Sequence, residues 1–361
     1  MTPHSSEPTD RATDKESVCF VVVSYNNEHT ITECIDSLLQ QTIPPSRIVV
    51  VDNASQDRTV HLLADYPKVQ LVKMERNTGF PAACNAGAKL STEQLLAFVN
   101  PDASITPTWT EEMIRGLSRL TNAGAITSRI LTTRPRIPAQ EIINADGNDM
   151  NFLGFAWCRN LGLPKIRSDG RAEVLYPSGA AMLVRREAFL TVQGFDSDLF
   201  LYHDDVDLGL RLRLAGWEIY LVPKAEAFHD YQFIRNKAKW FFLERNRLIV
   251  VLKIFGVRTL TLILPAIFVG EIAVLFNSAT TGWFGLKMQS YLSFLSTLSS
   301  TLAKRRLLQS IRKVPDSALI RLMTGRISHP YLTNSRLAAS FNLFLDKYRT
   351  TLLDPQPSGF T

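Results

Sequence analysis

Short apolar segments alternate with helix-like segments over the first hundred residues. Four of the apolar runs are rich in β-branched residues and predict buried strands: 18–25, 47–53, 69–74 and 95–102. Three intervening stretches have helical spacing or composition: 31–39, 57–65 and 81–90. This alternation predicts right-handed βαβ units around a mostly parallel, Rossmann-like sheet flanked by helices.

The pattern weakens in the middle of the chain and then returns. Residues 130–175 are rich in Arg, Pro and Gly, and we expect a long excursion that covers part of a binding site. Regular elements follow in this order: a strand over 174–184, a short amphipathic helix over 204–217, and two strands within 218–229.

From residue 231 onward the chain is aromatic, basic and apolar at once. Residues 259–270 are uncharged, and the apolar character resumes after Glu271. A membrane span needs about 20 apolar residues, and this stretch reaches that length only by including Pro265 and Glu271. We therefore favour an interfacial or re-entrant helical hairpin, although 248–276 can also span or lie flat. Basic amphipathic helices follow after 302.

Charge divides the chain near the same point. Residues 1–230 hold 22 Lys and Arg against 29 Asp and Glu, a net charge of −7, whereas residues 231–361 hold 18 against 5, a net charge of +13. A basic and apolar segment suits an anionic membrane surface better than a nucleic acid. The sequence contains no zinc-finger, RNP or basic-zipper pattern, so we expect no nucleic-acid partner.

The termini and cysteines complete the division into regions. The first residues are polar and include acids, so they do not form a signal peptide, and we expect a loose tail over 1–16. The four cysteines form no CxxC pair, which favours reduced, buried thiols over a zinc ribbon or a disulfide scaffold. We expect a catalytic α/β domain over 17–230 and a helical extension over 231–361.

Polar residues stand where three predicted strands end. Tyr25 and Asn26 follow the first strand, Asp52 ends the second, and Asn100-Pro101-Asp102 follows the fourth. Parallel sheets bind ligands at this edge, and the absence of GxGxxG after the first strand argues against a dinucleotide oxidoreductase. Asp52 is either a turn or capping residue or a hydrogen-bond acceptor for a pyrimidine base. Asp102 either shapes a turn or holds a divalent cation on a nucleotide diphosphate.

Three acidic residues crowd the start of the helix predicted over 204–217: Asp204, Asp205 and Asp207. Acids are favourable in the first turn of any helix. Adjacent carboxylates also repel each other, which raises a pKa and prepares a general base. We assign no function to the neighbouring His203.

Two further candidates lie beyond the acidic helix. His229 ends the last strand, and such a histidine is either structural or a metal ligand. Arg245 and Arg247 also allow two interpretations. They form either a pair at an interface, with buried aliphatic chains and solvated guanidinium groups, or contacts to a diphosphate.

Taken in order, these segments resemble family 2 glycosyltransferases of the glycosyltransferase-A fold, and most closely bacterial rhamnosyltransferases of cell-wall or surface polysaccharide synthesis. The segments that carry the resemblance are VVVSYNN (21–27), VDNASQD (51–57), NTGFPAACNAG (77–87), VNPDA (99–103), SGAAMLVRREAF (178–189), GFDSDLFLYHDDVDLGLRLRLAGW (194–217), AFH (227–229) and ERNRL (244–248).

The resemblance implies an inverting transfer from a nucleotide-sugar donor. Its donor-binding residues would be Tyr25, Asn26, Asp52, Asn77, Gly79, Asn100 and Asp102. Asp102 matches the last Asp of the family's metal-binding DxD motif, whose first Asp is replaced by Asn100, and His229 matches a further ligand of Mg²⁺ or Mn²⁺. Asp205 matches the catalytic base, and Asp204 replaces the usual Glu beside it.

The same resemblance suggests the partners and the location. The donor would be dTDP-rhamnose, with UDP- or GDP-linked sugars as alternatives, and the acceptor a saccharide linked to polyprenyl diphosphate. Residues 231–361 would then dock on the cytoplasmic face of the membrane, or form a homo-oligomer. Two other readings stay open: a catalytically silent nucleotide-sugar-binding scaffold of the same fold, and a sugar-phosphate nucleotidyltransferase. The latter lacks support because the chain has no N-terminal Gly-rich phosphate loop.

Overall fold

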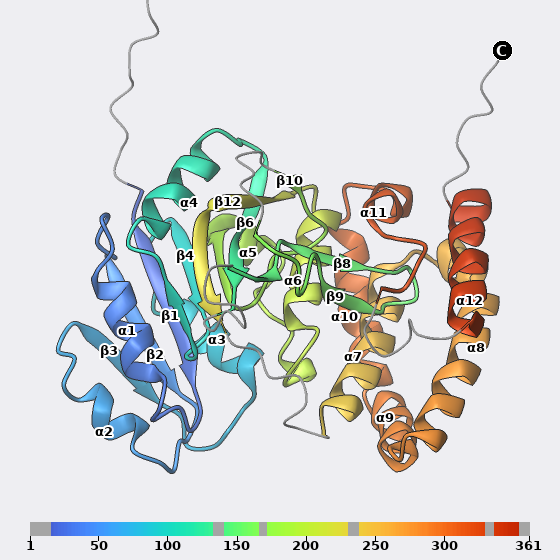
Figure 1. Ribbon diagram of the computed structural model, residues 1–361, viewed down its shortest axis with the longest axis horizontal. Helices are drawn as coiled ribbons and strands as arrows, with labels where there is room; N and C mark the ends of the chain where they lie inside the picture. Colours follow the sequence, from blue (N-terminus) through green and yellow to red (C-terminus); the bar gives the residue numbers. More distant parts are fainter. Residues whose placement is uncertain (1–15, 133–140, 166–171, 230–237, 329–335, 354–361) are drawn as a thin grey trace, which may run out of the picture.

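A computed structural model describes residues 16–132, 141–165, 172–229, 238–328 and 336–353 of the chain (Figure 1). The tail predicted over 1–16 lies almost wholly outside these residues. The strands are β1 (Val18–Ser24), β2 (Arg47–Asp52), β3 (Val69–Lys73), β4 (Leu95–Val99), β5 (Ala103–Ile105), β6 (Ala123–Leu131), β7 (Ile143–Ala145), β8 (Asn148–Met150), β9 (Ala156–Cys158), β10 (Ala172–Glu173), β11 (Ala181–Arg185) and β12 (Glu218–His229).

The helices fall into two groups along the chain. Those of the α/β part are α1 (Ile31–Leu39), α2 (Thr59–Leu63), α3 (Phe80–Ala88), α4 (Trp109–Ser118), α5 (Arg186–Thr191), the short 3₁₀ helix η1 (Ser197–Leu199) and α6 (Asp204–Leu214). Those of the helical region are α7 (Lys239–Ile254), α8 (Val257–Thr280), α9 (Phe284–Ser296), α10 (Leu298–Ser310), α11 (Asp316–Leu322) and α12 (Arg336–Tyr348), followed by the π-helical turn η2 (Arg349–Leu353).

One large sheet has the strand order β10-β12-β6-β11-β4-β1-β2-β3. The pairs β4–β1, β1–β2 and β2–β3 are parallel, and β6 is parallel to β12. β11 is antiparallel to both β4 and β6. All seven residues of β1 are buried, as expected for a central strand covered on both faces. The predicted α/β class with a mostly parallel sheet is confirmed.

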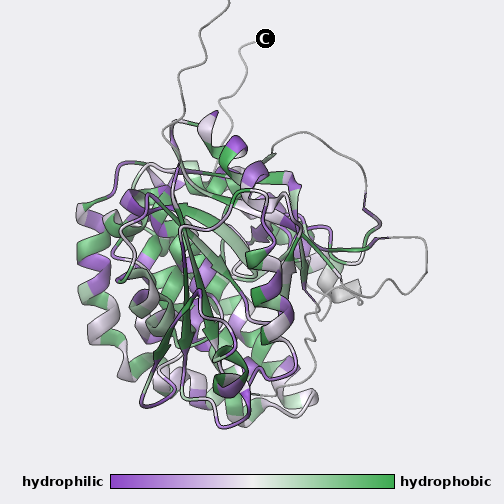
Figure 2. Ribbon diagram, turned by 90° about the vertical axis from the view of Figure 1, so that its left-hand side faces the viewer, coloured by the Kyte–Doolittle hydropathy of each residue, from purple (hydrophilic) through white to green (hydrophobic). Residues whose placement is uncertain are grey.

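Helices cover both faces of this sheet. Apolar residues of α1, α2 and α4 pack on one face, and those of α3, α5 and α6 pack on the other. Figure 2 views the molecule from the β3 edge and shows hydrophobic strands between helices that carry polar residues outward. The result is a three-layer arrangement of helices, sheet and helices.

Two predictions about the middle of the chain are wrong in detail. The strand expected over 174–184 begins only at Ala181, and the two strands expected within 218–229 are one strand, β12, with an irregularity between Val222 and Glu226. The region 130–175 contains the end of β6 and several short strands, and its segments 133–140 and 166–171 lie outside the described residues.

α6 is shared by two hydrophobic cores. Leu208 and Leu212 face the sheet, whereas Val206, Leu210 and Leu214 face the helical region, where they pack with residues of α7, α8, α10 and α11. Every residue of α6 except Asp205 is buried. The helical region therefore packs directly against the element that carries the candidate base. The domain boundary predicted at 230–231 lies outside the described residues.

α8 is one uninterrupted helix that includes both Pro265 and Glu271. Its inward face consists of Thr259, Ile263, Ala266, Gly270, Val274 and Ser278. Glu271 turns inward and pairs with Arg247 and Lys287, so it does not break the outward apolar face. Within the described residues, α8 is the one helix that is long and apolar enough to cross a membrane, judged by length and composition.

Candidate functional site

Asp52 is the last residue of β2, and only one of its two carboxylate oxygens has a hydrogen-bond partner among the described residues. Oδ2 accepts a hydrogen bond from the Ser55 amide at 3.1 Å. Oδ1 is buried and has no hydrogen-bond partner within the described part of the chain. A buried acceptor without a donor is unfavourable, which makes this oxygen a candidate acceptor for a ligand's donor group.

Tyr25 and Asn26 lie beside Asp52 on the adjacent strand end, because Ser24 is in register with Asp52. Asn26 has a left-handed backbone (φ 56°), and its amide donates to Ser55 Oγ while its Oδ1 accepts from the Gln56 amide. Asn26 therefore shapes the loop. Tyr25 is 45% exposed, so its ring can stack on a planar base.

Asn77 and Gly79 shape the loop that enters α3. Asn77 Oδ1 accepts from Asn53 Nδ2 and from the Gly79 amide, both at 2.9 Å. Gly79 has φ 83°, and a Cβ there would lie 2.5 Å from the Phe200 carbonyl oxygen. Only glycine allows this approach. Asn53, the polar residue that follows Asp52 at the strand end, holds the same loop, because its Oδ1 accepts from the Thr78 amide.

Asp102 and His229 form a pair at the end of β4. β12 runs antiparallel to β5 with His229 opposite Ala103, which places His229 Nε2 at 3.1 Å from Asp102 Oδ1. Burial alone would raise the pKa of Asp102, but the hydrogen bond and the charge of His229 lower it below its usual value. The Asp102 side chain is 43% exposed, so the pair is open to a ligand.

This donor set fits a divalent cation that is shared with a substrate. A carboxylate oxygen and an imidazole nitrogen are both ligands for Mn²⁺, and Mg²⁺ uses one or two carboxylates with phosphate oxygens and water. No group of three or more His, Cys, Asp or Glu residues suited to a metal occurs among the described residues. A cation here would therefore take its remaining ligands from a diphosphate and from water.

Asp205 and Asp204 begin α6 in unlike surroundings. Asp205 accepts from the Gly179 amide at 3.1 Å and from the Val206 amide at 2.8 Å. Burial raises the pKa of Asp205, and burial together with the charge of Asp205 raises the pKa of Asp204. The next residue of the same loop, Ala180, accepts from the Asn100 amide at 2.9 Å. The acidic pair is thus linked to the strand end that carries Asp102.

The chain matches the family described as glycosyl transferase family 2 over residues 19–192, and glycosyl transferase family group 2 over residues 154–304. The N-acetylglucosaminyl-diphospho-decaprenol L-rhamnosyltransferase of Mycobacterium tuberculosis is 31% identical over 228 residues, which cover 58% of this chain and 74% of that protein. The chain belongs to glycosyl transferase family 2. The family and enzyme class predicted from the ordered motifs are confirmed.

Further relatives of this family 2 glycosyltransferase match over smaller shares of their length. Succinoglycan biosynthesis protein ExoO of Rhizobium meliloti is 36% identical over 207 residues, which cover 55% of this chain and 56% of ExoO. O-antigen biosynthesis protein RfbC of Myxococcus xanthus is 27% identical over 229 residues, which cover 61% of this chain and 17% of RfbC.

Solved structures agree with the fold. A crystal structure of GalNAc-T7 with UDP, GalNAc and Mn²⁺ superposes with a TM-score of 0.55 at 14% identity, over 66% of this glycosyltransferase and 48% of that chain. The crystal structure of S. aureus TarS superposes with a TM-score of 0.50 at 16% identity, over 95% of this chain and 56% of TarS. This glycosyltransferase spans about half the length of both.

The structure does not place Arg247 at a diphosphate site. Its guanidinium is buried, pairs with Glu244 and Glu271, and donates to the Leu153 carbonyl at 3.1 Å. Arg245 is also engaged inside the protein, where it donates to the carbonyls of Asp198 and Leu199. Both side chains therefore support the fold of this glycosyltransferase. The predicted diphosphate contact is corrected for Arg247, whose donors already have partners, and for Arg245 it stays a prediction.

Proposed function

We propose that this enzyme transfers a sugar, with inversion, from a nucleotide diphosphate donor to a hydroxyl of a lipid-linked saccharide. One observation carries the proposal. Asp52, with its buried and unpaired oxygen, ends β2, the pair Asp102–His229 lies beyond the end of β4, and backbone hydrogen bonds link the loop that holds Asp205 to Asn100 at the end of β4. These strand ends are where open α/β sheets bind ligands.

The donor would bind along the ends of β1, β2 and β4. Asp52 Oδ1 would accept from the base, the exposed ring of Tyr25 would stack on it, and Asp102 with His229 would hold Mg²⁺ or Mn²⁺. When bound, the cation would offset negative charge on the departing diphosphate. The Mn²⁺ in the GalNAc-T7 structure, which shares the fold, supports a divalent cation here.

Asp205 would act as the general base. Its carboxylate would take the proton of the acceptor hydroxyl while that oxygen bonds to the anomeric carbon and the bond to the diphosphate breaks. In a single displacement of this kind the anomeric configuration inverts. Two backbone amides fix the carboxylate of Asp205 at the start of α6, so its direction toward the acceptor would be set before substrate binds.

The acceptor and the location follow from the relative and from the helical region. The relative from M. tuberculosis is named for a decaprenol-linked substrate and for L-rhamnose, so we propose a polyprenyl-diphosphate-linked acceptor and dTDP-rhamnose as donor. The outward face of α8 is apolar, with Leu264, Phe268 and Phe276 exposed by 62%, 67% and 72%. This face and the basic charge after residue 231 suit the anionic cytoplasmic face of a membrane.

Donor binding across a panel of nucleotide sugars tests this proposal. We expect one donor to bind to the full chain in the presence of Mg²⁺ or Mn²⁺, and the affinity to fall at least tenfold with chelator or in Asp102→Ala. Asp65→Asn changes an exposed carboxylate just after α2, serves as the control and should bind normally. Binding of no donor by the folded protein would contradict the proposal, and binding without any hydrolysis or transfer would favour a silent scaffold.

A further inference from the structure

The backbone immediately before the acidic pair is strained. Phe200, Tyr202 and His203 all have left-handed backbone angles (φ 63°, 65° and 59°) although none is glycine. Such angles are disfavoured for residues with a Cβ and persist only where surrounding contacts impose them. The segment 200–203 leads directly into Asp204 and Asp205, so whatever holds it also sets where these carboxylates lie.

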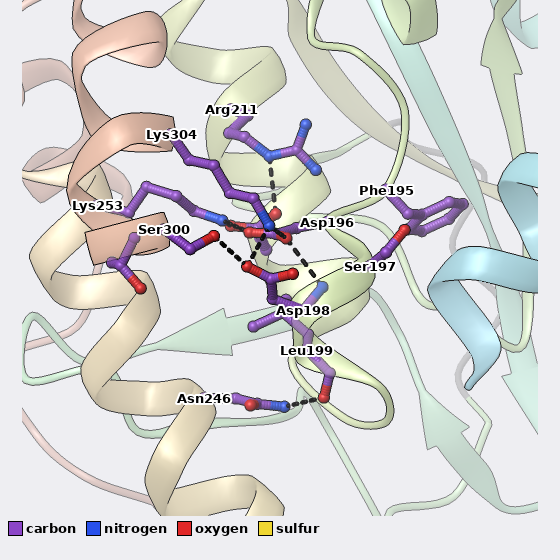
Figure 3. Close-up of polar contacts among 12 residues, drawn as sticks. Phe195, Asp196, Ser197, Asp198, Leu199, Arg211, Asn246, Lys253, Ser300 and Lys304 are labelled. Carbon is purple, nitrogen blue, oxygen red and sulfur yellow. Dashed lines mark hydrogen bonds and ion pairs between the residues drawn. The ribbon is translucent and has the colours of Figure 1, made fainter. Parts of the chain in front are cut away.

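Asn246 on α7 supplies most of those contacts. Its Nδ2 lies 3.0 Å from the Leu199 carbonyl oxygen, 2.9 Å from that of Leu201 and 2.7 Å from that of Tyr202. The side chain is fully buried, and Figure 3 shows it reaching the loop from α7. Its Oδ1 accepts from Arg245 Nε at 2.9 Å, which fixes the direction of the amide.

The remaining carbonyls of the turn are held by other elements. Arg245 Nη2 donates to the Asp198 and Leu199 carbonyls at 2.6 and 2.8 Å. The Phe80 amide, at the start of α3, donates to the Phe200 carbonyl at 2.9 Å. Each carbonyl from Asp198 to Tyr202 therefore has a donor from outside the turn, and α7 supplies every one except that of Phe200.

We propose that Asn246 is a positioning residue for Asp205, which rests on the proposed role of Asp205 as the base. The amide of Asn246 imposes the left-handed turn through three carbonyls, and the turn directs the first residues of α6 toward the acceptor. Asn246 touches no substrate in this account. It makes the helical region part of the catalytic apparatus, because α7 belongs to that region and not to the sheet.

A second set of contacts holds the same loop through side chains and not through the backbone carbonyls that Asn246 contacts. Lys253, Lys304 and Ser300 contact the side chains of Asp196 and Asp198, which precede the left-handed residues (Figure 3). Lys304 is 35% exposed. Lys304→Met therefore removes an anchor of the loop and leaves the carbonyl contacts of Asn246 in place, which makes it the matched control.

The experiment compares Asn246→Ala and Lys304→Met as full chains in lipid micelles, with folding checked by circular dichroism and thermal unfolding. A misplaced catalytic group costs roughly 100-fold in rate, so we expect Asn246→Ala to lose kcat by about that factor with donor Kd within twofold of wild type. Because a relaxed turn exposes Asp205 to water, the acidic limb of its kcat–pH profile should move to lower pH. Lys304→Met should keep kcat within twofold and an unchanged profile.

Equal losses of kcat in both variants, or a folded Asn246→Ala with wild-type kcat, would overturn the inference. If Asn246→Ala does not fold, Arg245→Gln takes its place, since it removes two carbonyl contacts and frees the amide of Asn246 to rotate, and it should lower kcat about tenfold. Failure of the proposed function gives a different result: the wild-type chain would then show no transfer at all. Failure of the base assignment alone would leave Asp205→Asn with wild-type transfer, whatever Asn246→Ala does.

Discussion

At the residue scale, Asp204 and Asp205 are neighbours with unequal roles. Asp204 is buried, and burial and the charge of Asp205 both favour its protonated form. Asp205 accepts two backbone amides, which favour its ionised form against the effect of burial. These contacts favour the ionised form of Asp205 over that of Asp204, in keeping with the proposed role of Asp205 as the base. Asp207, the third acid, is buried and paired with Arg211 and Lys253, so its role is structural.

This inequality predicts different results for two isosteric changes. Asp205→Asn should lower kcat by about 10²–10⁴-fold, the usual contribution of a general base. Asp204→Asn imitates the protonated carboxyl and should keep kcat within about tenfold. Because Asp205 works when ionised and its pKa is raised, wild-type activity should fall as pH drops through a value above 3.8. Steady-state kinetics over pH checks this, and equal losses in both variants would contradict it.

His203 is a second titratable residue whose environment has a measurable consequence. Its Nε2 lies 3.2 Å from the Gly154 carbonyl, and burial lowers its pKa from 6.5 to about 4. Because the folded state disfavours the charged imidazole, protonation of His203 lowers the free energy of unfolding. The contribution of the neutral imidazole is fully present above pH 6.5 and is lost as pH falls toward 4. The difference corresponds to roughly 3 kcal/mol.

Denaturant unfolding between pH 4 and pH 7 measures this loss. His203→Gln keeps a hydrogen-bond donor and cannot titrate. Between pH 7 and pH 4, the free energy of unfolding of this variant should therefore fall by roughly 3 kcal/mol less than that of the wild type. Parallel pH dependences for the two proteins would show that His203 does not contribute.

At the element scale, the strands with plain apolar patterns were predictable. β1, β2 and β4 lie within the expected segments because their residues are buried on both faces and need no polar partners. β6 was missed, although all of its residues are buried, because Ser128 and Arg129 interrupt its apolar pattern. Ser128 donates to the Ala181 carbonyl and Arg129 pairs with Asp146 at 2.7 Å. The sequence alone does not show these partners, and so its apolar pattern did not reveal β6.

The residues of the candidate site also differ in whether the sequence alone reveals them. Asp52, Asp102 and Asp205 were predictable because they stand beside recognisable strand and helix ends. Asn246 was not, since its function depends on three carbonyls more than 40 positions earlier in the chain. Arg247 was misassigned for the same reason: an arginine in a basic, aromatic segment gives no sign that Glu271, 24 positions later, neutralises it.

α8 carries a prediction about the membrane. Its outward side chains Leu264, Phe268 and Ile272 are 62%, 67% and 52% exposed. Replacing all three by Ser should weaken binding to anionic vesicles at least tenfold, because each apolar side chain contributes about 1.5–3 kcal/mol when buried. Leu190→Ser on α5, where the leucine is 54% exposed, is the control. Vesicle cosedimentation measures binding, and equal binding by the triple variant would exclude α8 as the contact.

At the scale of the whole molecule, the acidic α/β part and the basic helical part work as one unit. They meet on α6, whose two faces belong to different hydrophobic cores, and on the loop from Asp196 to His203, which both parts hold. A membrane contact made by the helical region would therefore place the strand ends and Asp205 at a fixed height above the lipid. This arrangement suits an acceptor whose sugar projects from a lipid diphosphate.

Sugar transfer to the acceptor can be measured directly. The full chain is incubated with Mg²⁺, a nucleotide sugar that it binds, and a polyprenyl-diphosphate-linked saccharide in anionic vesicles. Mass spectrometry detects the product, and nuclear magnetic resonance gives its anomeric configuration. The account predicts an acceptor extended by one sugar with the configuration opposite to that of the donor. No extension by a folded, donor-bound protein, or a product that retains the donor configuration, would contradict it.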